Sequence, residues 1–128
     1  MDPISDMFIR IKNAQKAGHK TVQIPYSKFK HEIVKVLERT GRTAEADRKG
    51  KRTKKFLEIK LKYREDGAPL VLDVMLFSKP SRRLFSQVKA IPYAKHGGII
   101  VLSTSKGVLS AEEARKSKVG GQLIAEVW

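Results

Sequence analysis

The spacing of the apolar residues most constrains the fold of this chain, because it changes from a helical period to an alternating one along the sequence. Two helices are predicted in the first 41 residues, one starting at Asp2 and Pro3 and one running from a cap at Ser27 to Gly41. Their apolar stripes, spaced for one helix face, are Ile4, Met7, Phe8 and Ile11, then Phe29, Ile33, Val36 and Leu37. Each stripe marks the buried face of an amphipathic helix, and the outer face of the second helix is basic.

Strands are predicted by alternating or continuous apolar runs. These runs are residues 21–24, 57–63, 70–77, 84–88, 99–102 and 122–128. Residues 42–55 predict a weak strand followed by an exposed basic hairpin turn, and Ser110 with Glu113 fits a capping box that starts a short helix. The sequence therefore predicts an α+β fold.

The turn sequence at residues 65–69 divides the chain into two small domains. Residues 1–66 form an N-terminal α-β-α-β-β unit, and residues 67–128 form a mostly β C-terminal unit with a short helix. Both are basic, with 18 Lys and Arg against 9 Asp and Glu in the first and 9 against 4 in the second. A partner that contacts either domain is thus expected to be anionic.

The whole chain of 128 residues carries a formal net charge of +14, which favours a polyanion, above all a nucleic acid, as its partner. No apolar run is long enough to cross a bilayer, and the first residues do not fit a signal peptide. We therefore expect a soluble intracellular protein without a membrane partner. The chain contains no cysteine, so disulfides and thiolate chemistry are excluded.

Residues 103–107, Ser-Thr-Ser-Lys-Gly, form a hydroxyl-rich segment directly behind a predicted strand. Such a run is often only turn chemistry. Here the strand before it and the capped helix after it form a rigid mount, and its hydroxyls and lysine suit phosphates, riboses and base edges. We interpret Ser103, Thr104, Ser105, Lys106 and Gly107 as an RNA-contacting loop.

Other basic and aromatic residues extend the predicted interface. Arg82 and Arg83 suit either a phosphate or nearby acidic side chains, and Phe85 suits either a base stack or the core. In the N-terminal half, Arg10, Lys12, Lys28 and Lys54 are expected to neutralise phosphates and to orient the RNA.

Catalytic and metal-binding patterns are scarce. His31-Glu32 lacks the second histidine of a zinc-binding helix, and neither His19 nor His96 stands at a ligand spacing to it. We expect no enzyme activity, no metal and no cofactor. Two alternatives stay open: a nucleic-acid chaperone indifferent to RNA fold, and a nuclease whose catalytic groups meet only in the folded chain.

Residues 98–110 together with Glu113-Ala114-Arg115 closely resemble the signature of the ribosomal protein S8 family, of the bacterial type. Supporting matches lie at residues 2–11, at 78–83 and at 120–124, so the resemblance covers nearly the whole chain. Phe85 stands where this family commonly has tyrosine, and Gln122 where it commonly has glutamate. The segment 42–55 aligns with no motif of the family.

The resemblance implies a structural protein of the small ribosomal subunit that binds an irregular helix in the central domain of its rRNA and promotes assembly. It implies RNA contacts at Ser103 to Lys106 and at Gly121 and Gln122. It further implies neighbouring ribosomal proteins as partners, a monomer when free, and the cytoplasmic ribosome as location, with an organellar ribosome left open. Some members also bind the mRNA of their own operon, so repression of that translation is a further expectation.

Overall fold

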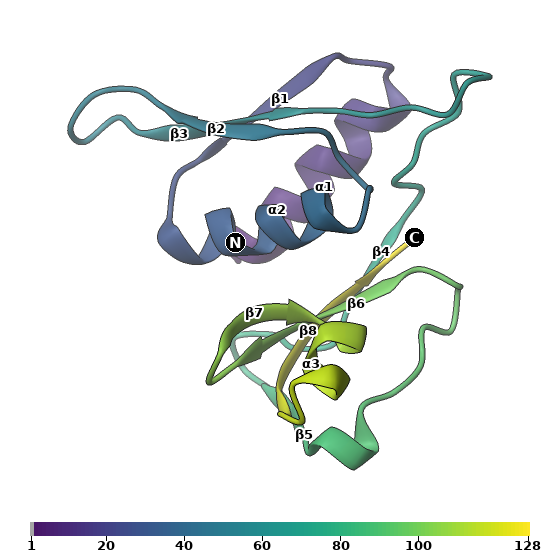
Figure 1. Cartoon of the computed structure of the whole chain (residues 1–128). Helices are drawn as coiled ribbons and strands as arrows, with labels where there is room; N and C mark the ends of the chain where they lie inside the picture. The colour runs from purple at the N-terminus through teal and green to yellow at the C-terminus, as the bar shows by residue number, and fades with distance from the viewer. Residues whose placement is uncertain (1) are drawn as a thin grey trace. The chain divides into compact units, whose positions relative to one another are not determined.

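The computed structural model describes residues 2–128, and its main body forms two compact units, Pro3–Leu72 and Asp73–Trp128 (Figure 1). The first unit combines two helices with three strands, and the second combines five strands with short helices. This arrangement confirms the predicted α+β class and the two kinds of unit.

The first unit contains α1 (Pro3–Lys16), β1 (Thr21–Pro25), α2 (Lys28–Arg39), β2 (Ala46–Lys49) and β3 (Phe56–Lys60). The strands form an antiparallel sheet in the order β1-β3-β2, and both helices lie on one face of it (Figure 1). The predicted cap at Ser27 is confirmed, since its side chain accepts a hydrogen bond from the Lys30 amide at 3.1 Å. Six of the eight residues of the predicted stripes are buried, while Ile4 and Phe29 are half-buried. The buried six are Met7, Phe8, Ile11, Ile33, Val36 and Leu37.

The second unit contains β4 (Val74–Leu76), β5 (Leu84–Ser86), the 3-10 turn η1 (Val88–Ala90), β6 (Ile99–Thr104), β7 (Gly107–Ser110), α3 (Ala111–Lys116) and β8 (Gly121–Val127). β8 is the central strand, with β6 on one side and both β4 and β5 on the other. The capping box is confirmed: Ser110 N donates to Glu113 Oε1 at 2.9 Å, and Glu113 N donates to Ser110 Oγ at 3.2 Å.

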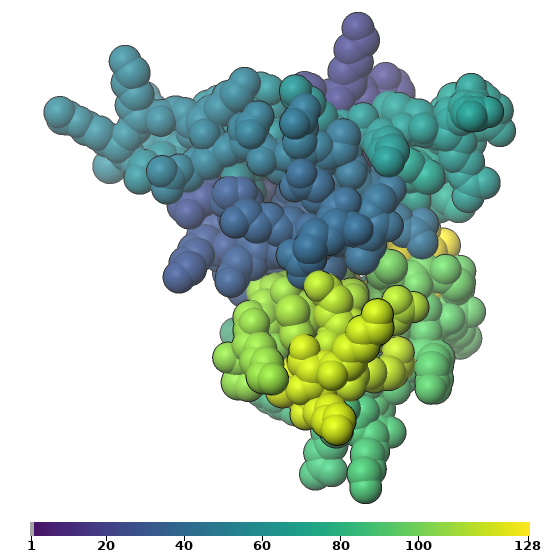
Figure 2. Space-filling model, in the orientation of Figure 1, coloured from purple at the N-terminus to yellow at the C-terminus, as the bar shows by residue number. Residues whose placement is uncertain are grey.

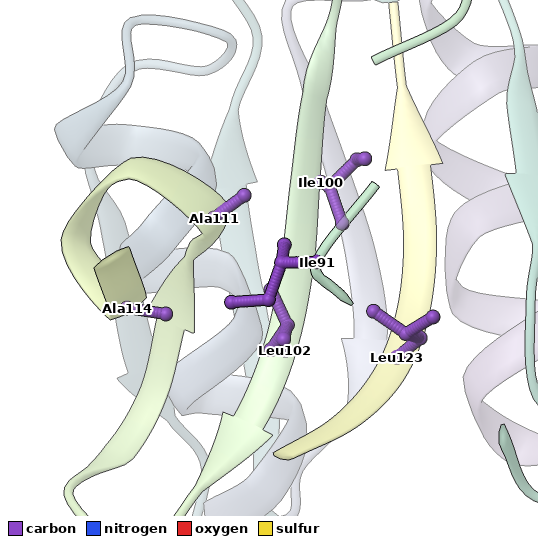
Figure 3. Packing of buried hydrophobic residues seen from close by; sticks show 6 residues of the cluster. All are labelled: Ile91, Ile100, Leu102, Ala111, Ala114 and Leu123. Atoms are coloured by element: carbon purple, nitrogen blue, oxygen red, sulfur yellow. The ribbon is translucent and has the colours of Figure 1, made fainter. Parts of the chain in front are cut away.

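A small apolar core lies between this sheet and α3. Its buried members are Ile91, Ile100, Leu102, Ala111, Ala114 and Leu123, which gather around β6 and β8 in Figure 3. Phe77, Val88, Ala94, Leu109 and Val119 pack against them. The strand that ends in the predicted hydroxyl loop is therefore anchored by buried side chains just before it reaches the surface.

The predicted strand 70–77 is wrong in its first half, because only Val74–Leu76 is a strand. Leu70 and Val71 belong to the first unit: Arg42 Nη1 donates to Leu70 O at 3.4 Å, and Val71 N donates to the buried Gln15 Oε1 at 2.7 Å. Along the chain, the division between the two units therefore falls after residue 72, six residues beyond the boundary expected from the turn.

Other strand boundaries also differ from the predicted ones. β3 ends at Lys60 rather than at residue 63, and the run 84–88 is a strand only to Ser86 before η1 begins. β6 extends through Thr104, and β7 follows it, a strand absent from the predictions. The weak strand and basic hairpin turn expected within residues 42–55 are confirmed as β2 and the turn at 50–55.

Candidate nucleic-acid interface

The predicted hydroxyl-rich loop, Ser103 to Gly107, is a tight hairpin between β6 and β7. Thr104 pairs with Gly107 across β6 and β7, so only Ser105 and Lys106 form the turn. Gly107 has a φ of 102°, a conformation that favours glycine. This turn fixes where its polar groups stand.

The Thr104 hydroxyl closes that turn. Its Oγ1 donates to Gly107 O at 2.7 Å and accepts from Lys106 N at 3.1 Å. A hydroxyl has one donor and two acceptor positions, so a single acceptor position stays available for a ligand. Ser105, by contrast, is an exposed residue at the tip, which makes its hydroxyl the better candidate for contact with an RNA.

The strand register brings the other predicted residues of this unit to the same place. Gln122 on β8 lies opposite Ser103 on β6 and opposite Phe85 on β5. Directly paired residues of neighbouring strands share one face of a sheet, so Phe85, Gln122 and Ser103 form a row across three strands. Phe85 is 72% exposed and therefore lies on the surface. Of its two predicted roles, the core role is excluded and the base-stacking role stays open.

Gly121 lets β8 approach β6 closely. A Cβ at this position would collide with the carbonyl oxygen of Ser103, and one at Gly120 would collide with that of Ser86. Only glycine fits where backbones pass this closely. Gly121 is therefore the first residue of β8, and Gly120 lies just before it.

Arg82 and Arg83 lie in the exposed connection from β4 to β5. Lys79 and Arg82 exchange two backbone hydrogen bonds, at 2.8 and 3.0 Å, which close this connection. Ser78 Oγ ties it to the sheet by donating to Leu123 O and accepting from Leu84 N. Within residues 2–128 neither arginine forms an ion pair, so the acidic partner considered for them is not found there.

The four basic residues predicted in the first unit do not form one cluster. Arg10 on α1 pairs with Asp6 at 3.0 Å and Lys12 is half-buried, whereas Lys28 is exposed at the start of α2. Lys54 is exposed in the turn between β2 and β3. Three separate elements therefore carry these charges.

Sequence reasoning missed a stacked pair in the second unit. The Arg115 guanidinium of α3 lies 4.3 Å from the ring centroid of Tyr93, which is 82% exposed. Arg115 Nη2 also donates to the carbonyl oxygens of Ile91 and Pro92, at 3.3 and 2.8 Å. Tyr93 and Arg115 are 22 positions apart in the sequence, so no local sequence pattern indicates that they are in contact.

The histidines are placed in structural surroundings. Burial, followed by the charges of Lys35 and Arg48, lowers the pKa of His31. His96 stacks on Trp128 with 3.8 Å between ring centroids, and its amide donates to the buried Glu126 carboxylate at 2.8 Å. Among the described residues, no three His, Asp or Glu side chains are grouped so as to hold a metal ion.

No helix within residues 2–128 is long and apolar enough to cross a membrane.

Residues 2–128 match the model of the family described as ribosomal protein S8. Three similar proteins carry the name small ribosomal subunit protein uS8. The one from Dictyoglomus turgidum is 44% identical over 128 residues, covering 99% of this chain and 97% of the relative. Those from Coprothermobacter proteolyticus and Thermus thermophilus are 46% and 43% identical over 129 and 135 residues, and each alignment covers 99% of this chain and 98% of the relative.

Proposed function

Since the chain belongs to the ribosomal protein S8 family, we propose that it is a primary rRNA-binding protein of the small ribosomal subunit. Its relatives are bacterial proteins of that subunit, so its place is in the cytoplasmic ribosome beside neighbouring ribosomal proteins. Its RNA target is an irregular helix in the central domain of the rRNA, and binding promotes assembly of that domain. The protein is a monomer before assembly, and its role there involves no catalytic step.

One observation carries the proposal of a specific RNA site. The register of β5, β8, β6 and β7 unites three segments that are far apart in the sequence: Phe85, Gly121 with Gln122, and the hairpin Ser103 to Gly107. Phe85 and the hairpin residues were predicted from their residue types, and Gly121 with Gln122 from the family resemblance. Their meeting on neighbouring strands gives one surface with an exposed aromatic ring, an amide and hydroxyl groups.

The chemistry of this surface suits an irregular RNA helix better than a regular one. An A-form helix hides its base edges in a deep, narrow groove, whereas an irregular segment exposes bases and riboses. The Ser105 hydroxyl and the Gln122 amide can each donate to and accept from such groups, and the Phe85 ring can stack on a base. Arg82, Arg83 and Lys106 add positive charge for the flanking phosphates.

The basic residues of the first unit supply affinity that does not depend on the RNA fold. Arg10, Lys12, Lys28 and Lys54 are proposed to neutralise phosphates and to orient the RNA. Selectivity then lies in the second unit.

The same surface supports a second candidate role, repression of the translation of its own operon. A site that recognises the shape of a helix binds an mRNA helix of that shape as well. Competition of such an mRNA helix with the rRNA helix for the protein tests this role directly.

The test of the proposed function removes polar groups at the hairpin and on β8. Ser105→Ala with Gln122→Ala is the variant of choice, because Thr104 also closes the turn. Binding to an irregular central-domain helix should weaken by about 1–3 kcal/mol, since RNA groups lose their hydrogen-bond partners. Binding to a fully paired helix of the same length should hardly change. Filter binding with both RNAs measures the difference.

Thr21→Ala serves as the matched control, because it removes an exposed hydroxyl from β1 in the other unit. It should leave both affinities unchanged. Wild-type protein that binds both helices equally would contradict the proposal and favour a general chaperone. Cleavage of the labelled RNA during the incubation would favour a nuclease instead.

A further inference from the structure

The hairpin that joins β2 to β3 carries the densest positive charge of the chain. We call residues 48–55 the basic arm; six of its eight residues are Lys or Arg. Figure 1 shows this hairpin extending beyond the helices of the first unit, and Figure 2 shows side chains standing out from its tip. All eight of its residues are exposed.

Acidic partners neutralise the stem of this hairpin but not its tip. Lys49 Nζ lies 2.9 Å from Glu58 Oε1, and Lys60 Nζ lies 2.9 Å from Glu45 Oε1. The tip, in contrast, carries four cations that have no ion pair with any residue from 2 to 128. They are Lys51, Arg52, Lys54 and Lys55.

The tip is an ordered turn rather than a loose tail. Gly50 has a φ of 95°, and a Cβ there would collide with the carbonyl oxygen of Lys54. Lys54 N donates to Lys51 O at 3.0 Å, and Tyr26 N donates to Lys55 O at 3.1 Å. The backbone that carries the four cations is therefore ordered before any partner binds, which lowers the backbone entropy that binding must overcome.

Arg48, at the base of the arm, lies beside aromatic residues at the start of α2. Arg48 lies over the Tyr26 ring, 5.3 Å from its centroid, and that ring meets His31 edge-on at 6.0 Å. Burial, followed by Lys35 and Arg48, lowers the pKa of His31, while Glu38 and Asp47 act in the opposite direction.

The side chains of the tip indicate which partner fits. Residues 50–55 contain no apolar or aromatic side chain, whereas protein interfaces depend on such anchors at their centre. Clustered cations without an apolar anchor suit a phosphodiester backbone, where each neutralised phosphate releases counterions. An RNA backbone therefore fits this surface better than a protein does.

We propose that the basic arm binds the phosphate backbone of a second RNA segment, outside the helix selected by the C-terminal hairpin, without reading its sequence. The inference rests on the proposed function, because it assumes that the protein's partner is RNA. It assigns a role to a segment whose sequence predicted only a weak strand and an exposed basic hairpin turn. The arm then adds affinity and salt dependence, and leaves the choice of helix to the other unit.

The test replaces Lys51, Arg52, Lys54 and Lys55 with glutamine and compares two RNAs. One is the irregular helix alone, and the other is the same helix extended by a regular duplex. For the extended RNA at 0.15 M salt we expect an affinity loss of about tenfold or more and a salt slope shallower by about 2–3. The preference for irregular over fully paired helices should not change.

A control variant with the same change in charge and composition replaces Lys16, Lys20, Lys62 and Arg64 with glutamine. These residues are exposed and lie in the same unit, near the opposite ends of β1 and β3. Its affinity should fall by no more than about threefold, as expected for a general loss of charge. Equal losses for the arm and control variants would overturn the inference.

A second arm variant, Lys51→Arg with Lys54→Arg and Lys55→Arg, keeps the charge and should keep the wild-type salt slope. Circular dichroism checks that all variants are folded. An unchanged slope in the glutamine variant would also overturn the inference, even when the wild type still selects the irregular helix. Failure of the proposed function differs, because the wild type would then show no such selection.

Discussion

Two β-hairpins of this molecule differ in almost every respect apart from their topology. The β6–β7 hairpin turns over two residues, and the Thr104 hydroxyl closes it through two hydrogen bonds. The β2–β3 hairpin turns over six residues, and cations occupy most of its tip. The first holds few polar groups in fixed positions, and the second concentrates charge.

Their surroundings differ in the same sense. β6 contributes Ile100, Val101 and Leu102 to the buried residues, whereas three of the four residues of β2 are exposed. A hairpin that selects by hydrogen bonds must be held rigidly, because small displacements break such contacts. Phosphate contacts tolerate displacement far better, since charge acts over a Debye length of about 8 Å at physiological salt. Each hairpin therefore has the support that its proposed role requires.

The largest expected effect comes from placing a side chain between β6 and β8. Gly121→Ala places a Cβ against the Ser103 carbonyl oxygen, so the strands must separate or distort. We expect the free energy of unfolding of the second unit to fall by about 3 kcal/mol. Urea unfolding followed by the fluorescence of Trp128 measures it, because this single tryptophan lies in that unit. The preference for the irregular helix should be lost as well, while salt-dependent binding through the basic arm persists.

Gly67→Ala is the control for this substitution. Gly67 has a φ of 86°, but a Cβ there would meet nothing within 4 Å. Its cost should be limited to backbone strain of about 1 kcal/mol and should not touch RNA selection. If the two substitutions lower the free energy of unfolding equally, the close approach of β6 and β8 at Gly121 does not contribute to the stability of the second unit.

A smaller effect is expected from the hydroxyl that closes the β6–β7 turn. Thr104→Val keeps the shape of the side chain but removes the bonds to Gly107 O and Lys106 N. The second unit should lose about 1 kcal/mol of stability, and selection should weaken because Ser105 is less firmly placed. Urea unfolding and filter binding measure the two effects. An unchanged preference for the irregular helix would show that RNA selection does not depend on the hydrogen bonds of the Thr104 hydroxyl.

The smallest expected effect concerns the field at the base of the basic arm. Arg48→Gln should raise the pKa of His31 towards the ordinary histidine value, because a nearby cation has been removed. Since the folded pKa lies below the unfolded one, protonation favours unfolding: the stability present above the ordinary pKa is lost as the pH falls through the folded pKa. NMR titration of the ring follows the shift. Arg64→Gln is the control, and an equal shift there would argue against a local field.

The helices and most strands could be predicted from sequence because their signals are local. Apolar spacing, the Ser27 cap and the capping box at Ser110 each involve residues within a few positions of one another. The failures arose where a distant partner decided the structure. Leu70 and Val71 read as a strand, but hydrogen bonds with Arg42 and Gln15 hold them in the first unit.

The candidate site could likewise be predicted only where its signal is local. The hydroxyl residues are neighbours in the sequence and could be recognised there. In contrast, β7 and the row of Phe85, Gln122 and Ser103 depend on strand register. The stacking of Arg115 on Tyr93 had no sequence signal at all. Residue types predicted the kind of partner, and only the fold showed which groups share a surface.

The most direct test of the division between the two hairpins is a double-variant cycle. The variants are Ser105→Ala with Gln122→Ala, the four-glutamine arm variant, and their combination, each measured for helix preference and salt slope. We predict that the first changes only the preference, that the second changes only the slope, and that their free-energy losses add within about 0.5 kcal/mol. The account is contradicted if either variant alone changes both quantities.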